Sequence, residues 1–412
     1  MQIALRRARL AVLALFALNG WLYASWAARI PEIQSRYGID DATVGFVLIT
    51  ASGGAFVAMP FAAYVNARLG LRRVAFASAA LYTVTVPLIP LFAEVAVLFA
   101  IYAFLGLGFG LLDVAMNAQA VEVERRYGRA IVSSFHAAFS AAMIVGALVS
   151  SLVIYLGLGL TAHLAIAAVA AAGLLVWAYP RLLPEEVFAA DADADAGAPA
   201  FRLPARATWL IGAIGFCSMM SEASIADWSA KYMLEVAGSA EVYAPWALAA
   251  FSVTMTLGRV FGDRLRDRLG DARLLRAGTA VALTGMLLAL LLPHPAAVIF
   301  GAGLVGTGLA TAVPIVFSLA GSVPGLSASA ALAMVTTISY VGLFLGPAVI
   351  GFLAEEFGLR AGYAFIGAAL TAMVVLAWRV RARPGRLDER SESGAEALVT
   401  GHKVASGAPA PE

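Results

Sequence analysis

The chain alternates between long apolar runs and short polar connections that are rich in arginine. A helix that crosses a bilayer needs about 20 mostly apolar residues. Runs of this length are expected at 8–30, 43–66, 73–92, 95–122, 130–156, 160–180, 207–234, 242–265, 274–292, 295–320, 327–354 and 360–380. A membrane β-barrel would show short segments of alternating hydrophobicity, which this chain lacks. The pattern predicts an all-α polytopic membrane protein with twelve transmembrane helices in the lipid bilayer.

Composition supports this class. Of the 412 residues, 61% are apolar and 13% are charged, whereas soluble domains are roughly half apolar and about a quarter charged. The net charge of +2 is too balanced to favour a nucleic-acid partner. The single cysteine, Cys217, excludes an internal disulfide and any cysteine-based zinc site.

Arginines gather on alternate connections, which predicts the orientation because basic loops stay in the cytoplasm. The expected cytoplasmic groups are Arg6 to Arg9, Arg68 to Arg73, Arg125 to Arg129, Arg181 to Arg206, Arg264 to Arg276 and Arg379 to Arg390. The opposite side receives Arg29, Arg36, Lys231 and Arg360. Both termini are therefore expected in the cytoplasm, with the protein in the cell (inner) membrane. The first run is longer than a signal sequence needs, so an uncleaved first helix is expected.

Two polar segments divide the chain. Residues 181–205 contain three prolines and an acidic run, and they predict a cytoplasmic linker between six-helix bundles at 1–180 and 206–381. The acidic run could instead bind a cation, but it shows no fixed ligand geometry. Residues 382–412, rich in Gly, Ser, Glu and Pro, predict a disordered cytoplasmic tail.

The two halves are related by a shift of 200 residues. This shift places Gly106 and Gly108 on Gly306 and Gly308, Arg68-Leu69-Gly70 on Arg268-Leu269-Gly270, and Gly146 on Gly346. A duplicated six-helix unit explains the common offset, and such repeats place a binding site at their interface near the bilayer midplane. The glycines at 106, 108 and 110 lie inside an apolar run, which favours close helix packing over a dinucleotide-binding loop.

Over residues 8–380 the chain resembles the major facilitator superfamily, whose loop signature is Gly-x3-Asp-Arg-x-Gly-x-Arg. The second half keeps Asp267-Arg268-Leu269-Gly270 and Arg273, with Asp263 in place of the first glycine. The first half keeps Arg68, Gly70, Arg72 and Arg73, but Ala63 and Ala67 replace the Gly and the Asp. The resemblance implies the family's fold, and it implies a gating role for Asp267 and Arg268 with a weaker latch in the first half.

A narrower resemblance covers two neighbouring runs. Asp113 and Asn117 form the acidic-x3-Asn segment of fucose-permease-like transporters, and Ser134-Phe135-His136 with Gly146 is similar to the next helix of that branch. An asparagine commonly stands there at the position of His136. The branch implies proton-coupled import of small polar solutes, sugars among them.

Ionisable residues inside membrane helices are costly and are functional candidates by default. Asp113 and Asn117 are four residues apart and share a helix face, and His136 is expected at a similar depth. Asp113 is the first candidate for proton coupling. The alternative is a neutral Asp113 that joins helices through Asn117 or His136.

The seventh run carries a second polar group. Glu222 has no obvious local cation and is the second proton-coupling candidate, with a purely structural role as the alternative. Asp227 and Lys231 are expected to form an intrahelical ion pair at i and i+4. Asp227 and Trp228 are also candidates for solute contact.

Two further groups complete the candidates. Asn19, Tyr23 and Trp26 share one helix face, where aromatic rings and an amide could bind a solute; an interfacial aromatic belt is the alternative for Trp26. Arg259 and Asp263 are expected to pair at i and i+4 in a gating or packing role.

The combined prediction is a secondary active transporter that imports a small polar solute with protons by alternating access. One chain supplies both halves, so a monomer is expected. The chain shows no metal-ligand spacing, no phosphate-binding loop and no hydrolytic constellation, so no cofactor, metal or enzymatic activity is predicted. An exporter of drugs or metabolites in the same superfamily is the first rival, and a membrane-embedded sensor or enzyme is the second.

Overall fold

The computed structural model describes residues 2–128, 131–184, 206–320, 323 and 328–380. These residues form helices joined by short connections, and no strand occurs within the described ranges. Most of the expected linker and the expected tail at 382–412 lie outside the described residues, and so does the side chain of Asp263. The all-α prediction is confirmed.

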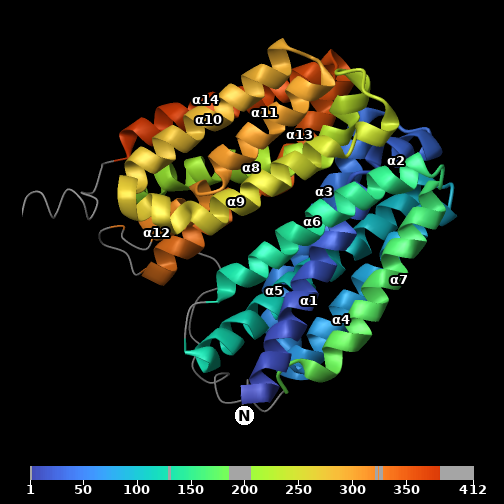
Figure 1. Ribbon diagram of the computed structural model, residues 1–412, viewed down its shortest axis with the longest axis vertical. Helices are drawn as coiled ribbons and strands as arrows, with labels where there is room; N and C mark the ends of the chain where they lie inside the picture. The colour runs from blue at the N-terminus through green and yellow to red at the C-terminus, as the bar shows by residue number, and fades with distance from the viewer. Residues whose placement is uncertain (1, 129–130, 185–205, 321–322, 324–327, 381–412) are drawn as a thin grey trace, which may run out of the picture.

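The helices form two groups, which appear in Figure 1 as the blue-to-green and yellow-to-red parts of the molecule. The first group is α1 (Gln2–Ala27), α2 (Ile30–Tyr37), α3 (Asp41–Leu69), α4 (Leu71–Thr85), η1 (Val86–Leu91), α5 (Val95–Tyr127), α6 (Val132–Tyr155), α7 (Leu160–Ala178) and η2 (Tyr179–Arg181). The second group is α8 (Arg206–Glu235), η4 (Glu241–Tyr243), α9 (Trp246–Leu269), α10 (Asp271–Leu291), α11 (Pro295–Leu309), α12 (Ala312–Ala320), α13 (Ala328–Phe357) and α14 (Leu359–Arg379).

Each expected run corresponds to one helix or to a consecutive pair. In the described part of the chain, 11 helical segments are long and apolar enough to cross a membrane, counting α4 with η1 and α11 with α12 as single segments. The remaining helix is α9, which carries Arg259, Arg264 and Arg266 along its length. These charges lower its hydropathy, and its place in the repeat makes it the twelfth helix.

Close packing in the two groups follows the 200-residue offset. Gly106 of α5 lies against the backbone of Ala51, and Gly306 of α11 lies against the backbone of Phe251. Gly108 meets Ser78 and Tyr82 of α4, and Gly308 meets Gly278 and Ala282 of α10. A side chain at either pair of glycines would collide with a neighbouring backbone, so both six-helix units use glycine at the same helix crossings.

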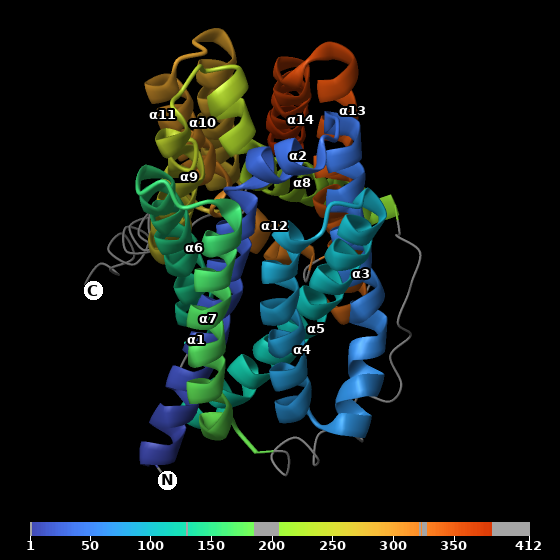
Figure 2. The ribbon, with the colours of Figure 1, turned by 90° about the vertical axis from the view of Figure 1, so that its right-hand side faces the viewer.

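The most extensive contacts between the two groups are those of α3 with α13 and of α6 with α9, and α1 and α2 also touch α8. They meet near α2 and diverge toward the ends where α5, α9 and α12 lie (Figures 1 and 2). We call the end near α2 the contact end. The other end carries the α3–α4 and α9–α10 connections with Arg72 and Arg268, and we call it the arginine-rich end.

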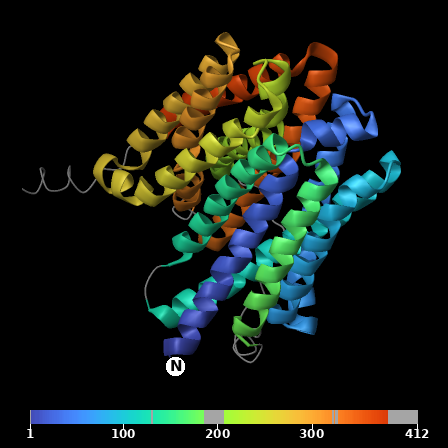
Figure 3. The same ribbon diagram turned by 45° about the vertical axis from the view of Figure 1, so that its right-hand side comes forward.

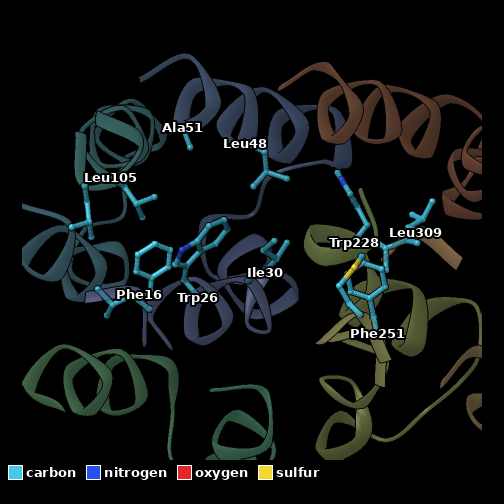
Figure 4. Close-up of a cluster of buried hydrophobic side chains, with 14 of the residues drawn as sticks. Phe16, Trp26, Ile30, Leu48, Ala51, Leu105, Trp228, Phe251 and Leu309 are labelled. Atoms are coloured by element: carbon cyan, nitrogen blue, oxygen red, sulfur yellow. The ribbon is translucent and has the colours of Figure 1, made fainter. Parts of the chain in front are cut away.

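A continuous apolar core supports this arrangement. Within the first group α1 lies between α6 and α7 (Figures 1 and 3) and packs against both. The core runs from Phe16 and Trp26 of α1 through Leu48 of α3 to Trp228 of α8, as Figure 4 shows. The core therefore reaches across the groups and holds the helices that carry the polar side chains described next.

Candidate functional site

A buried ionic cluster joins the two groups at the contact end. Lys231 of α8 donates from Nζ to Gln34 Oε1 at 2.7 Å and contacts the carboxylate of Asp41. Its Nζ also lies 3.2 Å from Glu235 Oε1. Glu355 of α13 accepts a hydrogen bond from the Asp41 backbone N–H at 2.9 Å. We call Gln34, Asp41, Lys231 and Glu355 the contact-end cluster, and it links four helices.

The expected ion pair between Asp227 and Lys231 is wrong. Asp227 Oδ1 instead accepts a hydrogen bond from the Tyr23 hydroxyl of α1 at 2.6 Å. Lys231 reaches across to Gln34 of α2 and Asp41 of α3, which together satisfy an ammonium that is almost fully buried. A buried charge needs several well-placed partners, and neighbouring helices supply more of them than one position on its own helix does.

Three of the expected solute contacts are buried in the packed structure. Trp228 is fully buried and donates from Nε1 to the Pro347 carbonyl at 3.0 Å. Trp26 is buried, with Nε1 donating to the Tyr82 hydroxyl at 3.2 Å. Asn19 is fully buried, with Nδ2 placed 3.8 Å from Met116 Sδ and Oδ1 without a partner among the described residues. These side chains join helices here and present no exposed surface to a solute.

Asp113 and Asn117 lie together on α5, one helical turn apart. Asn117 donates from Nδ2 to the Asp113 carbonyl at 2.8 Å and to the Asp113 carboxylate at 3.2 Å. Both side chains are partly exposed. The pairing is compatible with the structural alternative, but it leaves carboxylate lone pairs open, so Asp113 can also bind a proton or a solute.

Glu222 has a cation nearby that its own helix does not provide. Arg259 of α9 donates from Nη2 to Glu222 Oε1 of α8 at 3.1 Å. The two side chains are 32% and 28% exposed, so neither is sealed in the core. Sequence spacing suggested Asp263 as the partner of Arg259, and the described contact goes to the adjacent helix instead.

Two electrostatic interactions connect these polar residues across the two groups. Arg259 of the second group interacts electrostatically with His136 of the first. Asp113 of the first group likewise interacts electrostatically with Tyr340 of α13 in the second. His136 is exposed, and its ring meets Phe16 edge to face at 5.1 Å between centroids. We call Asp113, Asn117, His136, Glu222 and Arg259 the central polar layer.

The remaining candidates lie away from this layer. Asp267 and Arg268 are exposed at the arginine-rich end, at the connection between α9 and α10. At the contact end, hydrogen bonds from Thr43 hold the pKa of Asp40 below its usual range and cap the start of α3. No group of three or more metal-ligating side chains occurs among the described residues.

Sequence reasoning missed Gln34, Asp41, Glu355 and Tyr340. Asp41 lies at the start of a helix next to Asp40, where acidic residues are common for capping reasons alone. One signal did exist: the chain has two lysines, and Lys231 is the one inside a predicted span. A lysine in such a position requires an acidic partner elsewhere in the fold.

The fold and the polar layer define a class of protein: a multi-pass helical membrane transporter built from two similar units. Residues 10–331 and 246–410 match the Major Facilitator Superfamily. A relative described as an uncharacterized MFS-type transporter of Yersinia pestis is 33% identical over 88% of this chain and 93% of its own length. Membrane protein MosC of Rhizobium meliloti is 30% identical over 85% of this chain and 84% of its own. The chain belongs to the Major Facilitator Superfamily.

Solved structures agree on the fold. Two structures of the nucleoside transporter NupG superpose with TM-scores of 0.74 and 0.69, each over 90% of this chain. They cover 99% and 98% of the NupG chains, at sequence identities of 13% and 16%. At such identities the likeness concerns the fold alone.

Proposed function

We propose that this transporter imports a small polar solute together with protons by alternating access. The observation that carries the proposal is the central polar layer. Both groups carry ionisable side chains within long apolar helices, Asp113 and His136 on one side and Glu222 and Arg259 on the other, and Arg259 interacts with Glu222 and with His136. Such residues are costly in a membrane and persist where they bind a solute or an ion.

The contact-end cluster supports the alternating part of the proposal. Its bonds join α2 and α3 of the first group to α8 and α13 of the second, and the Tyr23 to Asp227 hydrogen bond adds a link from α1 to α8. Breaking these bonds while forming others at the arginine-rich end would expose the central polar layer to the two sides in turn. Asp267 and Arg268 are proposed to contribute at the arginine-rich end.

Asp113 is the proposed proton carrier. A carboxylate that couples transport must be neutral while the protein reorients and must release its proton on the inner side. Asp113→Asn mimics the neutral form at nearly constant volume. We expect this variant to keep solute binding and energy-independent exchange but to lose accumulation driven by a pH gradient. In the parent, coupling to one proton allows the solute to be concentrated about tenfold per pH unit of gradient.

The test is uptake and counterflow in proteoliposomes with a solute that raises the melting temperature of the purified protein. Glu222→Gln is the matched variant in the other group. If Asp113→Asn accumulates solute like the parent, Asp113 is not the coupling residue and Glu222 becomes the leading candidate. If neither variant nor the parent responds to the gradient, proton coupling is wrong.

Export of lipophilic compounds is the second candidate. Aromatic rings favour it: Tyr340 and Phe344 stack at 5.9 Å between centroids, and Phe344 meets Phe56 across the two groups at 5.5 Å. A pocket lined by such rings would suit a larger apolar substrate. Lowered susceptibility of expressing cells to lipophilic cations, without uptake of polar solutes, would favour export.

A further inference from the structure

Arg259 holds unused hydrogen-bonding capacity inside the central polar layer. Its guanidinium carries five N–H donors arranged to bind a carboxylate through two parallel bonds. Among the described residues it makes one hydrogen bond, from Nη2 to Glu222 Oε1 at 3.1 Å. Its side chain is 32% exposed, so the remaining donors are accessible.

Arg266 on the same helix is an arginine whose guanidinium binds both oxygens of a carboxylate. It donates to both oxygens of Asp271, from Nε at 2.5 Å and from Nη2 at 3.0 Å, and also contacts Ser318. Its side chain is 30% exposed, close to the value for Arg259. The difference between the two arginines therefore lies in how the guanidinium is paired and not in burial.

Polar side chains near Arg259 could bind the other polar groups of a solute whose acidic group contacts the guanidinium. On the side of the first group, His136 of α6 is exposed and lies within electrostatic range of Arg259, and the partly exposed Asn117 lies on α5. Glu222 keeps 28% of its surface exposed, so it stays hydrated if it leaves Arg259. The Glu222 carboxylate thus occupies the position that the carboxylate of a ligand could take.

We propose that the solute carries a carboxylate, and that this group binds the guanidinium of Arg259 through two hydrogen bonds in place of Glu222. The proposal rests on the proposed transport function and adds the substrate class: a small organic acid with hydroxyl or other polar groups. Two charge-assisted bonds replace the single bond to Glu222, and geometric matching makes the exchange favourable.

The charge of the ligand can be tested before the solute is known. The melting temperature of the purified full-length protein is measured with three matched sets: glucose, glucuronate and glucosamine; glycerol, glycerate and 2-amino-1,3-propanediol; benzyl alcohol, benzoate and benzylamine. We expect a carboxylate to raise the melting temperature by about 2–4 °C at saturation, and its neutral and cationic counterparts to have no effect. The proposal is overturned if a neutral compound raises the melting temperature as much as its carboxylate counterpart does. It is also overturned if none of the carboxylates raises the melting temperature.

Three variants locate the binding group. Arg259→Gln should weaken carboxylate binding by at least about tenfold, because a charge-assisted bond is lost. Glu222→Gln should strengthen it, because the competing carboxylate is gone. Arg266→Gln is the matched control on the same helix and should bind like the parent. Undiminished binding to Arg259→Gln, or weaker binding to Glu222→Gln, contradicts the assignment.

The outcome also separates this inference from the transport proposal. If a neutral solute binds and is accumulated with protons, the transport proposal stands and the carboxylate assignment falls. If carboxylates bind through Arg259 but are not accumulated in response to a pH gradient, the assignment stands and the coupling proposal falls.

Discussion

At the scale of single residues, three charged side chains, Lys231, Glu222 and Asp227, find polar partners on other helices. Lys231 is 3% exposed and bonds to residues of α2 and α3, although Asp227 stands one turn away on its own helix. Glu222 is paired from α9 and Asp227 from α1. Partners on separate helices make each pair sensitive to how those helices are placed, which is the property a moving transporter needs.

Replacing Lys231 should open the contact end. Lys231→Met removes the ammonium but keeps most of the side-chain volume, leaving the Asp41 carboxylate without its cation. Removing one partner of a buried ion pair costs about 3–5 kcal/mol. The substitution therefore destabilises the conformation in which the contact-end cluster is formed. Spin labels at Ser35 and Glu241, which lie on opposite groups around one cavity of about 470 Å³, should report longer distances than in the parent.

The matched control is the double variant Asp41→Leu with Lys231→Met, measured in a Cys217→Ser background. Replacing a buried pair by apolar residues is often neutral, so the double variant should recover part of the short-distance population. Unchanged label distances in Lys231→Met would show that the cluster does not hold the contact end together.

At the scale of elements, the crossing of α3 and α13 depends on two glycines. A Cβ added to Gly351 would come 2.6 Å from the Asp41 carbonyl oxygen and 2.8 Å from the Gly45 Cα. These atoms belong to the backbone, so they cannot avoid the added Cβ by a change of rotamer as a flexible side chain could. The same crossing carries Asp41 and Glu355, so the helix contact and the ionic cluster reinforce each other.

Gly351→Ala should therefore separate α3 from α13. We expect destabilisation of about 1–3 kcal/mol, the usual cost of overpacking, seen as a lower melting temperature and as longer Ser35 to Glu241 label distances. Gly53→Ala in α3 is the control, because a Cβ at Gly53 meets nothing within 4 Å. Since Gly→Ala raises helix propensity at both positions, an equal effect of the two substitutions would mean that the crossing at Gly351 is not responsible.

At the scale of the whole molecule, the arginine-rich end and the contact-end cluster lie at opposite ends of the helices (Figure 1). Basic connections remain in the cytoplasm, so the arginine-rich end is proposed to face the cytoplasm. The contact end, where α2, α8 and α13 come together, then faces the outside. In this orientation the bonds described here close the outer side, and the central polar layer would exchange solute with the cytoplasm.

The orientation can be tested by fusions. An alkaline phosphatase reporter after residue 390 should be inactive and one inserted near residue 238 should be active, because that enzyme folds where disulfides form. A green fluorescent protein at the same positions should give the converse pattern. Activity of the phosphatase at residue 390 would overturn the proposed placement of the C-terminus.

The helices, their number and their repeat can be predicted from the sequence alone. Membrane helices must satisfy their backbone groups internally, so each apolar run is an element on its own and can be located without knowing its neighbours. The glycines at the 200-residue offset were likewise informative, because close approach of two backbones excludes larger side chains at Gly106 and Gly306. The chemistry of the central layer was also visible, since Asp113, Asn117 and Glu222 are unusual in apolar runs.

Which polar residues meet depends instead on how the helices pack against one another. Spacing along one helix suggested Asp227 with Lys231 and Arg259 with Asp263, whereas the described contacts pair Asp227 with Tyr23, Lys231 with Asp41 and Arg259 with Glu222. Periodicity fixes which side of a helix a residue occupies, but the rotation of each helix against the others is set by packing over its whole surface. The pairing of long-range partners such as Asp41 and Glu355 follows from that packing, and it cannot be predicted from a local sequence pattern.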